Sequence, residues 1–401
     1  MSLKRRDFLG NISKAGLLGT LTTVPGIIKA ATSEVENLAP GFSALPYIQA
    51  LTSNQVTIHW ICNTPSYSWV EIKEEGAEPV KKHAITNGLV EANKRINKVT
   101  IHNLKPGTAY SYRVFSKHIE EFKPYQLTYG EELVSEEFHF KTYKESPEEV
   151  HWVVLNDIHD RPASFKVLMD LVKKPYDFVL LNGDMFDYQT DEQQFINHLL
   201  TPCTNAFAAS VPFMFLRGNH ETRGKFARNI HEYYSNINNG EYFAFQHGPV
   251  FIITLDTGED KADDTDVYAG IVDFDSYREE QAVWLEEVLK SPQAVNAPFR
   301  VVMMHIPPIH SGDWHGPTHV NKLFHPLFNK YKVDAVISGH THRKKFYDKD
   351  PGNMNYSLHI GGGPREGQRT LITVAASGTQ LTIDIINEDG TVFNSKTSFR
   401  N

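Results

Sequence analysis

The chain has 401 residues, of which 40% are hydrophobic and 22% charged, and it carries a formal net charge of −8. This length and composition predict a globular protein of two or three domains. The negative charge argues against nucleic acid or an anionic membrane surface as an obligatory partner. We expect the two cysteines, Cys62 and Cys203, to be buried free thiols rather than a disulfide between domains.

The first 31 residues resemble a twin-arginine signal peptide. Residues 4–10, KRRDFLG, precede an apolar stretch from Ala15 to Ile28. This stretch is too short to span a bilayer, because a span needs about 20 residues. We expect cleavage after Ala30 or Ala31; the alternative is an ordinary Sec signal in which the arginine pair arose by chance. The resemblance implies a bacterial protein without a transmembrane segment, which the twin-arginine machinery exports already folded to the periplasm or the medium.

The next region, residues 40–142, contains short runs of alternating apolar and polar residues separated by turn residues. This pattern predicts an all-β sandwich. The run LKPGTAYSYRV at 104–114 resembles fibronectin type III sandwiches, and Tyr110, Tyr112 and Val114 would lie on one face of its strand. We therefore expect a fibronectin III-like domain, with an unrelated sandwich as the alternative and a polar linker at 143–149.

Five short motifs occur in the C-terminal part of the chain, each after an apolar run. Such runs predict buried strands of a mostly parallel sheet, and the carboxyl ends of these strands carry the site in open α/β folds. We therefore expect the polar side chains of the motifs to converge in one crevice. The motifs are Asp157-Ile158-His159, Gly183-Asp184-Met185-Phe186-Asp187, Gly218-Asn219-His220-Glu221, Val302-Met303-Met304-His305 and Gly339-His340-Thr341-His342.

The spacing of apolar residues between these strands predicts helices, and a closing pair of antiparallel strands is predicted near the C-terminus. The pair would cover one edge of the sheet. The predicted helices are 163–173, 191–199, 277–290 and 321–331, and the predicted strands are 370–377 and 380–387.

The motifs offer carboxylates, imidazoles and one amide, but no thiolate. This donor set suits Zn, Fe, Mn or Mg. It is too large for one tetrahedral ion and suits two ions that share a carboxylate, which lie roughly 3.5–4 Å apart in such centres. Two divalent ions, two aspartates and a hydroxide would leave a positive charge, which suits an anionic substrate such as a phosphate ester.

The ordered motifs resemble the calcineurin-like metallophosphoesterase superfamily over roughly residues 150–365. The resemblance implies a four-layer βαββαβ sandwich of the α/β class, which we place at residues 148–398. It also implies two ions of Fe, Zn or Mn and a metal-bound hydroxide as the nucleophile. His220 would face the substrate, and it would steady the developing charge or protonate the leaving oxygen. The implied ligands are Asp157, His159, Asp184 and His342 for one ion, and Asp184 as a bridge with Asn219, His305 and His340 for the other.

A sandwich ahead of such a domain resembles the architecture of the purple acid phosphatases. Those enzymes have Asp-x-Gly and Gly-Asp-x-x-Tyr at the first two motifs, and the tyrosine binds ferric iron and gives the colour. This chain has His159 and Asp187 at these positions. We expect His159 to replace the lost phenolate, so that the dinuclear centre has no tyrosinate absorption. Asp187 would orient a ligand rather than bind a metal itself.

Three further features are candidates for roles around the site. Arg217 ends a predicted strand and would be either a salt-bridge partner or a substrate contact. His310, Trp314 and His315 form a rim candidate that could contact the phosphate or the leaving group. The acidic stretch 258–277 is either a solvated loop, a rim that rejects highly anionic substrates, or a peripheral cation site.

Three functions compete. The sandwich supports a phosphomonoesterase that resembles acid phosphatases, acting on a small phosphate ester. The Asp-x-His first motif supports a phosphodiesterase, since many diesterases of the superfamily share it. A non-catalytic protein that binds phosphate ligands should lack some metal ligands, and none is missing here, so the sequence favours an enzyme.

Overall fold

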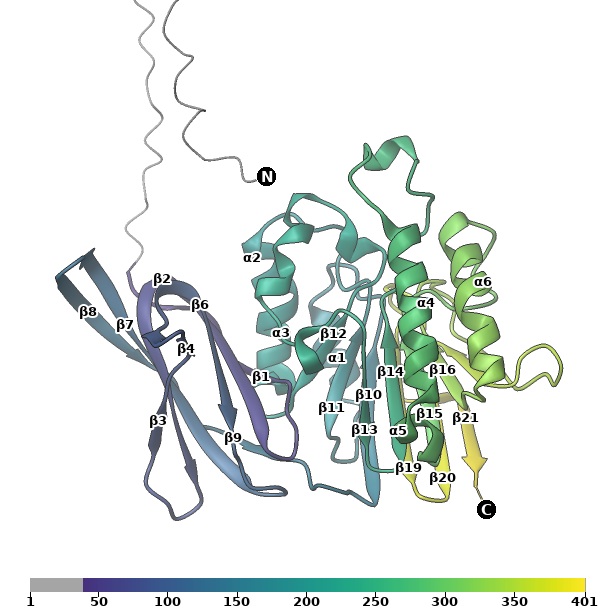
Figure 1. Cartoon of the computed structure of the whole chain (residues 1–401), viewed down its shortest axis with the longest axis horizontal. Coiled ribbons are helices and arrows are strands. Elements are labelled where there is room, and N and C mark those ends of the chain that lie inside the picture. Colours follow the sequence, from purple (N-terminus) through teal and green to yellow (C-terminus); the bar gives the residue numbers. More distant parts are fainter. Residues whose placement is uncertain (1–38, 401) are drawn as a thin grey trace, which may run out of the picture. The chain divides into compact units, whose positions relative to one another are not determined.

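The computed structural model describes residues 39–400, and the expected signal peptide lies outside this range. An all-β domain comes first in the chain, and an α/β domain follows it (Figure 1). Within the described range, no helix combines the length and the apolar character needed to cross a membrane.

The N-terminal domain is built around one long strand. Its strands are β1 (Phe42–Gln49), β2 (Gln55–Glu74), β3 (Val80–Lys82), β4 (Ile85–Thr86), β5 (Leu89–Val90), β6 (Ala92–His102), β7 (Ala109–Lys123), β8 (Gln126–Val134) and β9 (Phe138–Lys141). The first half of β2 pairs with β1 and β6, and its second half pairs with β7 and β3. The change of partner coincides with a register shift between Ile61 and Ser66, where Pro65 cannot donate a ladder hydrogen bond.

The core of this domain joins the two halves of β2. Trp60 from the first half and Val70 from the second lie in one buried cluster with Tyr110, Tyr112 and Val114 of β7. Because the last three residues alternate along the strand, their side chains share one face. The predicted β-sandwich is therefore confirmed.

Two mixed six-stranded sheets form the centre of the C-terminal domain. Across the first sheet the order is β12 (Phe213–Leu216), β11 (Phe178–Asn182), β10 (Glu149–Leu155), β19 (Thr370–Ser377), β20 (Gln380–Asn387) and β21 (Val392–Phe399). Across the second sheet the order is β13 (Phe243–His247), β14 (Val250–Leu255), β15 (Phe299–Met304), β16 (Ala335–Ser338), β18 (Ser357–Ile360) and β17 (Lys345–Tyr347).

The strands that carry the motifs are divided between the two sheets of the predicted four-layer sandwich, and each sheet is mixed rather than mostly parallel as expected. Strands β10, β11 and β12 run parallel in the first sheet, and β14, β15, β16 and β18 run parallel in the second. Antiparallel strands extend both sheets. Four of these pairs join consecutive strands, for which a short connection suffices, whereas β19 pairs with β10 from far along the chain.

Helices cover the outer face of each sheet, so the predicted four-layer α/β sandwich is confirmed. The sheets face each other across a core that includes Trp152 and Phe178 from the first and Val301 and Ile337 from the second. On the first sheet lie α1 (Ala163–Met169) and a helical segment made of α2 (Glu192–Phe195), a π-helix (Ile196–Leu200), α3 (Thr201–Cys203) and a second π-helix (Thr204–Ala208). On the second lie α4 (Phe274–Lys290), α5 (Pro292–Asn296) and α6 (His315–Lys330) (Figure 1).

All four predicted helices are present with different ends. The first is shorter than predicted, and the second continues through π-helical turns as far as Ala208. The fourth begins at His315 instead of at 321. Pro317 lies in its first turn, where a missing N–H costs no hydrogen bond, so the proline does not delay the start of the helix.

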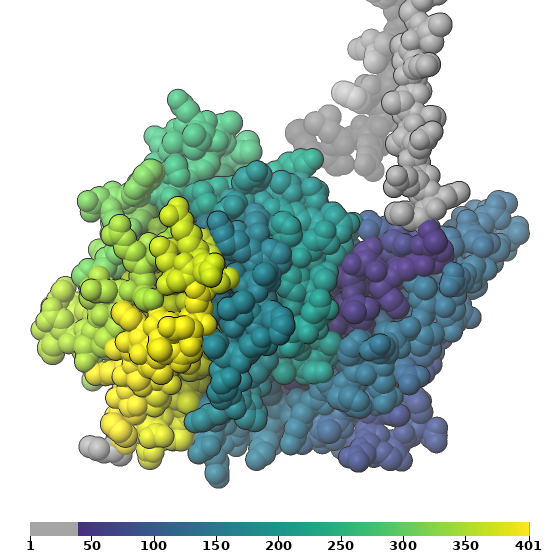
Figure 2. All heavy atoms as spheres, turned by 180° about the vertical axis from the view of Figure 1, so that it is seen from behind, coloured from purple at the N-terminus to yellow at the C-terminus, as the bar shows by residue number. Residues whose placement is uncertain are grey.

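The C-terminal strands cover the free edge of β10, as the sequence predicted. Strand β19 pairs with β10 from Glu149 opposite Ser377 to Val154 opposite Ile372, and β20 and β21 continue the sheet. Seen from behind, the yellow C-terminal strands lie beside the blue-teal part of the domain (Figure 2). This edge is therefore paired rather than exposed, which protects it from association with other chains.

Hydrogen bonds join the sandwich to the α/β domain at buried positions. The hydroxyl of Tyr47 donates to the carbonyl oxygen of Tyr233 (2.6 Å), and His59 Nε2 lies 3.0 Å from Ser235 Oγ. The ring of His59 stacks on Tyr47 with a centroid distance of 5.2 Å. Burial lowers the pKa of His59 to about 3.

The neutral state of His59 should make the protein less stable in acid. The unfolded chain binds a proton near the ordinary pKa of 6.5, whereas the folded chain binds it only near pH 3, so the free energy of unfolding falls as the pH falls between these values. The slope is about 1.4 kcal/mol per pH unit. We expect the melting temperature, measured by calorimetry, to fall less between pH 7 and pH 5 in His59→Gln than in the parent. In the control His231→Gln, at an exposed position, it should fall as much as in the parent. An equal loss in His59→Gln would contradict this reasoning.

Candidate metal centre

The side chains of all five motifs lie just beyond the carboxyl ends of strands, where the two sheets meet. The Gly339 N–H donates to the His305 carbonyl oxygen (3.0 Å), and the His340 N–H donates to the Asp157 carboxylate (3.0 Å). The second of these bonds connects a residue after a first-sheet strand with one after a second-sheet strand. The residues follow β10 (Asp157, His159), β11 (Asp184, Asp187), β12 (Asn219, His220), β15 (His305) and β16 (His340, His342).

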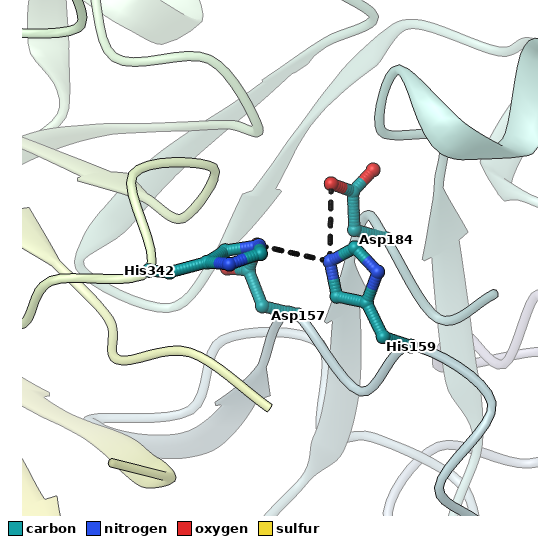
Figure 3. Close-up of side chains that lie close together, drawn as sticks. All are labelled: Asp157, His159, Asp184 and His342. Atoms are coloured by element: carbon teal, nitrogen blue, oxygen red, sulfur yellow. Dashed lines mark hydrogen bonds and ion pairs between the residues drawn. The ribbon is translucent and has the colours of Figure 1, made fainter. Parts of the chain in front are cut away.

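One cluster contains Asp157, His159, Asp184 and His342, which each place one potential ligand atom within 4.8 Å of the others (Figure 3). His159 Nε2 lies 2.9 Å from His342 Nε2 and 3.5 Å from Asp184 Oδ2. His342 Nε2 lies 3.3 Å from Asp157 Oδ1. Two imidazole nitrogens that face each other between two carboxylates are suited to a shared cation.

A second cluster contains Asp184, His305 and His340. His305 Nε2 lies 3.0 Å from Asp184 Oδ2, and His340 Nδ1 lies 3.0 Å from Asn219 Oδ1. Asp184 therefore belongs to both clusters, which is the position that a bridging carboxylate needs. The structure brings together all seven side chains that the resemblance implies as ligands.

The backbone at this site is strained. Asp157, His159, Asp184, His340 and His342 all have φ between +50° and +69°, the left-handed region that non-glycine residues rarely adopt. Each such conformation costs about 1–3 kcal/mol and persists only where the surroundings hold it. Hydrogen bonds between the loops do so here, since the His159 N–H donates to the Asp184 carbonyl oxygen (2.9 Å). Strain of this kind concentrates at functional sites.

The buried charges show that the donor set fits metal ions. Burial raises the pKa of the carboxyls of Asp157 and Asp184, but the neighbouring histidines outweigh it and hold both pKa values well below their usual range. Conversely, burial lowers the pKa of His305, but the charge of Asp184 outweighs it and raises the pKa to about 10. The two buried carboxylates therefore stabilise positive charge beside them. Bound metal ions would supply this charge in place of the protons on the histidines.

An unpaired nitrogen gives a second indication of fit. His305 is fully buried, and its Nε2 has no hydrogen-bond partner among the described residues. Its Nδ1 lies 2.9 Å from the Asn182 carbonyl oxygen, which fixes the ring so that Nε2 faces Asp184. A histidine held in this way through one nitrogen is typical of a metal ligand.

Asp187 lies where a residue that orients His159 should lie. Its Oδ1 is 2.8 Å from His159 Nδ1, while the opposite nitrogen of His159 faces the first cluster. The side chain of Asp187 is half exposed. The carboxylate therefore stands behind the imidazole. That it orients a ligand rather than binding a metal stays a prediction, since Asp187 also offers a ligand atom within 4.8 Å of His159 and His220.

His220 lies at the edge of the site, on a 3₁₀ turn (His220–Thr222) shortly after the end of β12. Its Nδ1 donates to the Asp187 carbonyl oxygen (2.6 Å), and its Nε2 accepts from Arg223 (3.0 Å). Its ring meets His159 edge-on with a centroid distance of 4.6 Å. Burial lowers the pKa of His220; the charge of Asp184 opposes this shift, and the charge of Arg223 adds to it. These contacts describe a neutral imidazole beside the candidate ligands.

Two predicted candidates lie in other surroundings. Arg217 is paired with the buried carboxylate of Asp256 (2.7 Å from Nε), so the structure favours the salt-bridge alternative over the substrate contact. His310 stacks on Tyr347 with a centroid distance of 4.0 Å and lies in neither cluster. A contact between His310 and the substrate stays a prediction.

Sequence reasoning gives Glu221 no role, although it ends the third motif. This buried carboxylate accepts hydrogen bonds from the backbone N–H groups of Asp184 (2.8 Å), Met185 (2.7 Å) and Gly218 (2.7 Å). Burial raises its pKa to about 7, with a contribution from the charge of Asp184. Glu221 thus fixes the loops that present Asp184 and Asn219. An acidic residue as the last member of a strand-end motif was the signal available in the sequence.

A salt-bridge network beside His220 was also missed. Arg223 binds Glu259 through both carboxylate oxygens (2.8 and 2.9 Å) and Asp260 (3.2 Å), in addition to His220. Glu259 is fully buried and also accepts from the hydroxyl of Tyr268 (2.8 Å). The beginning of the acidic stretch is therefore packed against the site, and the reading of 258–277 as a solvated loop is wrong for these residues.

Comparison with protein families identifies both domains. Residues 151–344 match the family described as calcineurin-like phosphoesterase, and residues 46–142 match the purple acid phosphatase N-terminal domain. The chain therefore carries these two domains in this order, as the resemblances in the sequence implied.

Two curated relatives are similar to most of this chain at low identity. Acid phosphatase type 7 of Mus musculus is 26% identical over 317 residues, which are 72% of this chain and 66% of the relative. A probable purple acid phosphatase 20 of Arabidopsis thaliana is 26% identical over 362 residues, which are 82% and 76% of the two chains. The chain thus spans just under two thirds of the length of the mouse protein.

Solved structures show the same fold. A purple acid phosphatase from yellow lupin (Lupinus luteus) seeds matches with a TM-score of 0.66 and 16% identity, over 90% of this chain and 75% of the other. The structure of PhoD matches with a TM-score of 0.60 and 14% identity, over 90% of both chains. The fold is therefore that of the purple acid phosphatases, an all-β domain followed by an α/β phosphoesterase domain.

Proposed function

We propose that this chain, which joins a purple acid phosphatase N-terminal domain to a calcineurin-like phosphoesterase domain, hydrolyses phosphate monoesters with the help of two metal ions. The observation that carries the proposal is the convergence of seven nitrogen and oxygen ligand candidates around one shared carboxylate, Asp184. The names of the mouse and Arabidopsis relatives, both acid phosphatases, support the choice of phosphate esters.

The ligands that we propose fall into two sets. Asp157, His159, Asp184 and His342 would hold one ion, and Asp184, Asn219, His305 and His340 would hold the other. Bound there, Fe, Zn or Mn ions would neutralise charge on the phosphate and make a water nucleophilic near neutral pH. The protein keeps these ligands in place through the strained loops and through Glu221.

His220 and Arg223 would act on the substrate from the edge of the site. The Nε2 of His220 accepts from Arg223, so a proton on this nitrogen would displace that hydrogen bond. Two roles follow. His220 either positions the phosphate together with Arg223, or it takes up a proton and passes it to the leaving oxygen. The dependence of rate on the leaving group separates these roles.

A phosphodiesterase is the alternative, and the Asp-x-His first motif favours it. Hydrolysis of p-nitrophenyl phosphate and of bis-p-nitrophenyl phosphate by the metal-loaded protein tests both functions in one assay. We expect kcat/KM for the monoester to exceed that for the diester by at least about tenfold, a difference of about 1.4 kcal/mol in transition-state binding. The opposite preference would establish the diesterase, and failure to hydrolyse either ester would contradict both.

The cellular location that we propose is inferred from the N-terminal sequence. We infer export by the twin-arginine machinery, because residues 4–10 (KRRDFLG) precede a short apolar stretch. A centre with seven ligands from two sheets forms only in the folded chain, and metal binding is coupled to folding in such sites. Export of an already folded protein would keep ions that were acquired in the cytoplasm.

A further inference from the structure

Two neighbouring helices, α4 and α6, carry a second group of potential metal ligands. The helices contact each other on the outer face of the second sheet (Figure 1). Asp275 and Glu279 are four residues apart at the start of α4, and His315 and His319 are four residues apart at the start of α6. Residues at this spacing lie on the same side of a helix, so each helix presents one pair.

The polar atoms of these residues converge. His315 Nε2 lies 2.8 Å from both carboxylate oxygens of Asp275, and His319 Nδ1 lies 3.1 Å from Asp275 Oδ1. Asp275, His315 and His319 each offer a ligand atom within 4.8 Å of the others. Glu279 Oε1 lies 3.9 Å from His319 Nε2, and its exposed side chain is free to approach. None of these residues belongs to the central clusters.

His319 supplies an independent indication of a ligand. The residue is only 9% exposed, yet its Nδ1 has no hydrogen-bond partner among the described residues. The nitrogen faces the Asp275 carboxylate at close range without the alignment of a hydrogen bond. Two metal ligands have this geometry, because both point at the ion between them and not at each other. A buried imidazole nitrogen with no partner is unfavourable, and a bound ion would give it a partner.

The charges around the cluster favour a cation. Arg278 Nη1 donates to Asp275 Oδ1 (2.9 Å), and its other donors bind the carbonyl oxygens of Thr257 and Glu259, so Asp275 Oδ2 accepts no hydrogen bond from Arg278. Asp263 adds negative charge, since its carboxylate accepts from the Asp275 N–H (2.8 Å).

We propose that Asp275, His315 and His319 bind a divalent ion of the zinc type, with Glu279 or water as the fourth ligand. Two imidazoles and one or two carboxylates are a donor set that Zn²⁺ takes in tetrahedral geometry. The ion would tie α4 to α6. Because the Gly316 N–H on α6 donates to the Asp260 carbonyl oxygen (2.9 Å), it would also stabilise the acidic stretch beside the phosphoesterase site.

Counting bound zinc tests this site directly. The full-length protein and its variants are dialysed against a buffer of fixed free Zn²⁺, and the ions per chain are measured by inductively coupled plasma mass spectrometry. His315→Ala should bind one ion fewer than the parent at micromolar free Zn²⁺. The loss of a ligand should weaken this site by more than the roughly 10–100-fold that an outer-shell change costs. His315 is exposed, so its removal leaves the core intact.

A matched control and a second variant decide the outcome. His325 lies on the same helix but bonds to the hydroxyl of Tyr356 (2.6 Å), so His325→Ala should bind as many ions as the parent. His319→Asn should repeat the loss seen in His315→Ala. Added Zn²⁺ should raise the melting temperature of the parent more than that of either variant. Equal ion counts in parent, His315→Ala and His319→Asn would overturn the proposal.

Discussion

Replacing Asp184 with asparagine should cost more metal and more activity than any other single ligand change. Asp184 Oδ2 faces His305 at 3.0 Å and His159 at 3.5 Å, so one carboxylate serves both clusters. Asparagine keeps the size of the side chain but removes its charge, and each ion would lose an anionic ligand. We expect Asp184→Asn to lose both ions and to lower turnover of p-nitrophenyl phosphate by more than about 100-fold, the upper cost of an outer-shell change.

Three controls make the Asp184 result specific. His159→Ala should lose mainly the first ion, and Asn219→Ala mainly the second. Asp177 precedes β11 while Asp184 follows it, and Asp177 bonds to His247 (2.9 Å), so Asp177→Asn should keep both ions. Metal content and activity are measured on the same preparations. Near-normal values in Asp184→Asn would show that another residue forms the bridge.

Replacing His220 with alanine or asparagine should leave both ions bound and slow turnover by about 10²–10⁴-fold, the range for a lost proton-transfer group. Both nitrogens of His220 already have partners, because Nδ1 bonds to the Asp187 carbonyl oxygen and Nε2 to Arg223, although Nε2 also lies 4.0 Å from Asp184 Oδ2. If His220 protonates the leaving oxygen, the loss should shrink for p-nitrophenyl phosphate, whose leaving group needs little protonation. Rates with alkyl and aryl phosphates measure this difference.

The same rates distinguish the two roles of His220. An equal loss for alkyl and aryl esters would assign His220 to positioning the phosphate with Arg223, and Arg223→Lys should then show a similar pattern. The exposed His231→Ala serves as the control and should retain parental rates. Loss of metal in the His220 variants would remove the residue from the substrate-facing role altogether.

The candidate ligands could be predicted because each follows an apolar run, and strands bury such runs in a predictable direction. The sandwich could be predicted because alternation along a strand places Tyr110, Tyr112 and Val114 on one face. The two sheets were part of the predicted four-layer sandwich, but the sheet to which each motif strand belongs could not be predicted, because β10 and β15 have equally apolar sequences and nothing local distinguishes their partners.

Other features depend on partners that are remote in the sequence. Glu221 accepts from backbone N–H groups, which every residue carries, so its role leaves little trace in residue types. Glu259 lies in a stretch typical of a solvated loop, and it is buried because Arg223, 36 positions earlier, pairs with it. His315 and His319 lie on the same side of a helix only because α6 begins at His315, earlier than its apolar pattern indicates.

The most direct test of the central claim is a metal titration in the His315→Ala background, which removes the proposed peripheral site. Metal-free protein is titrated with Fe, Zn or Mn while bound ions, absorption and hydrolysis of p-nitrophenyl phosphate are recorded. We expect two ions per chain, activity that appears with the second ion, and no violet absorption, since Asp187 replaces the tyrosine. Full activity with one ion, or a violet colour with iron, would contradict the dinuclear centre that we propose.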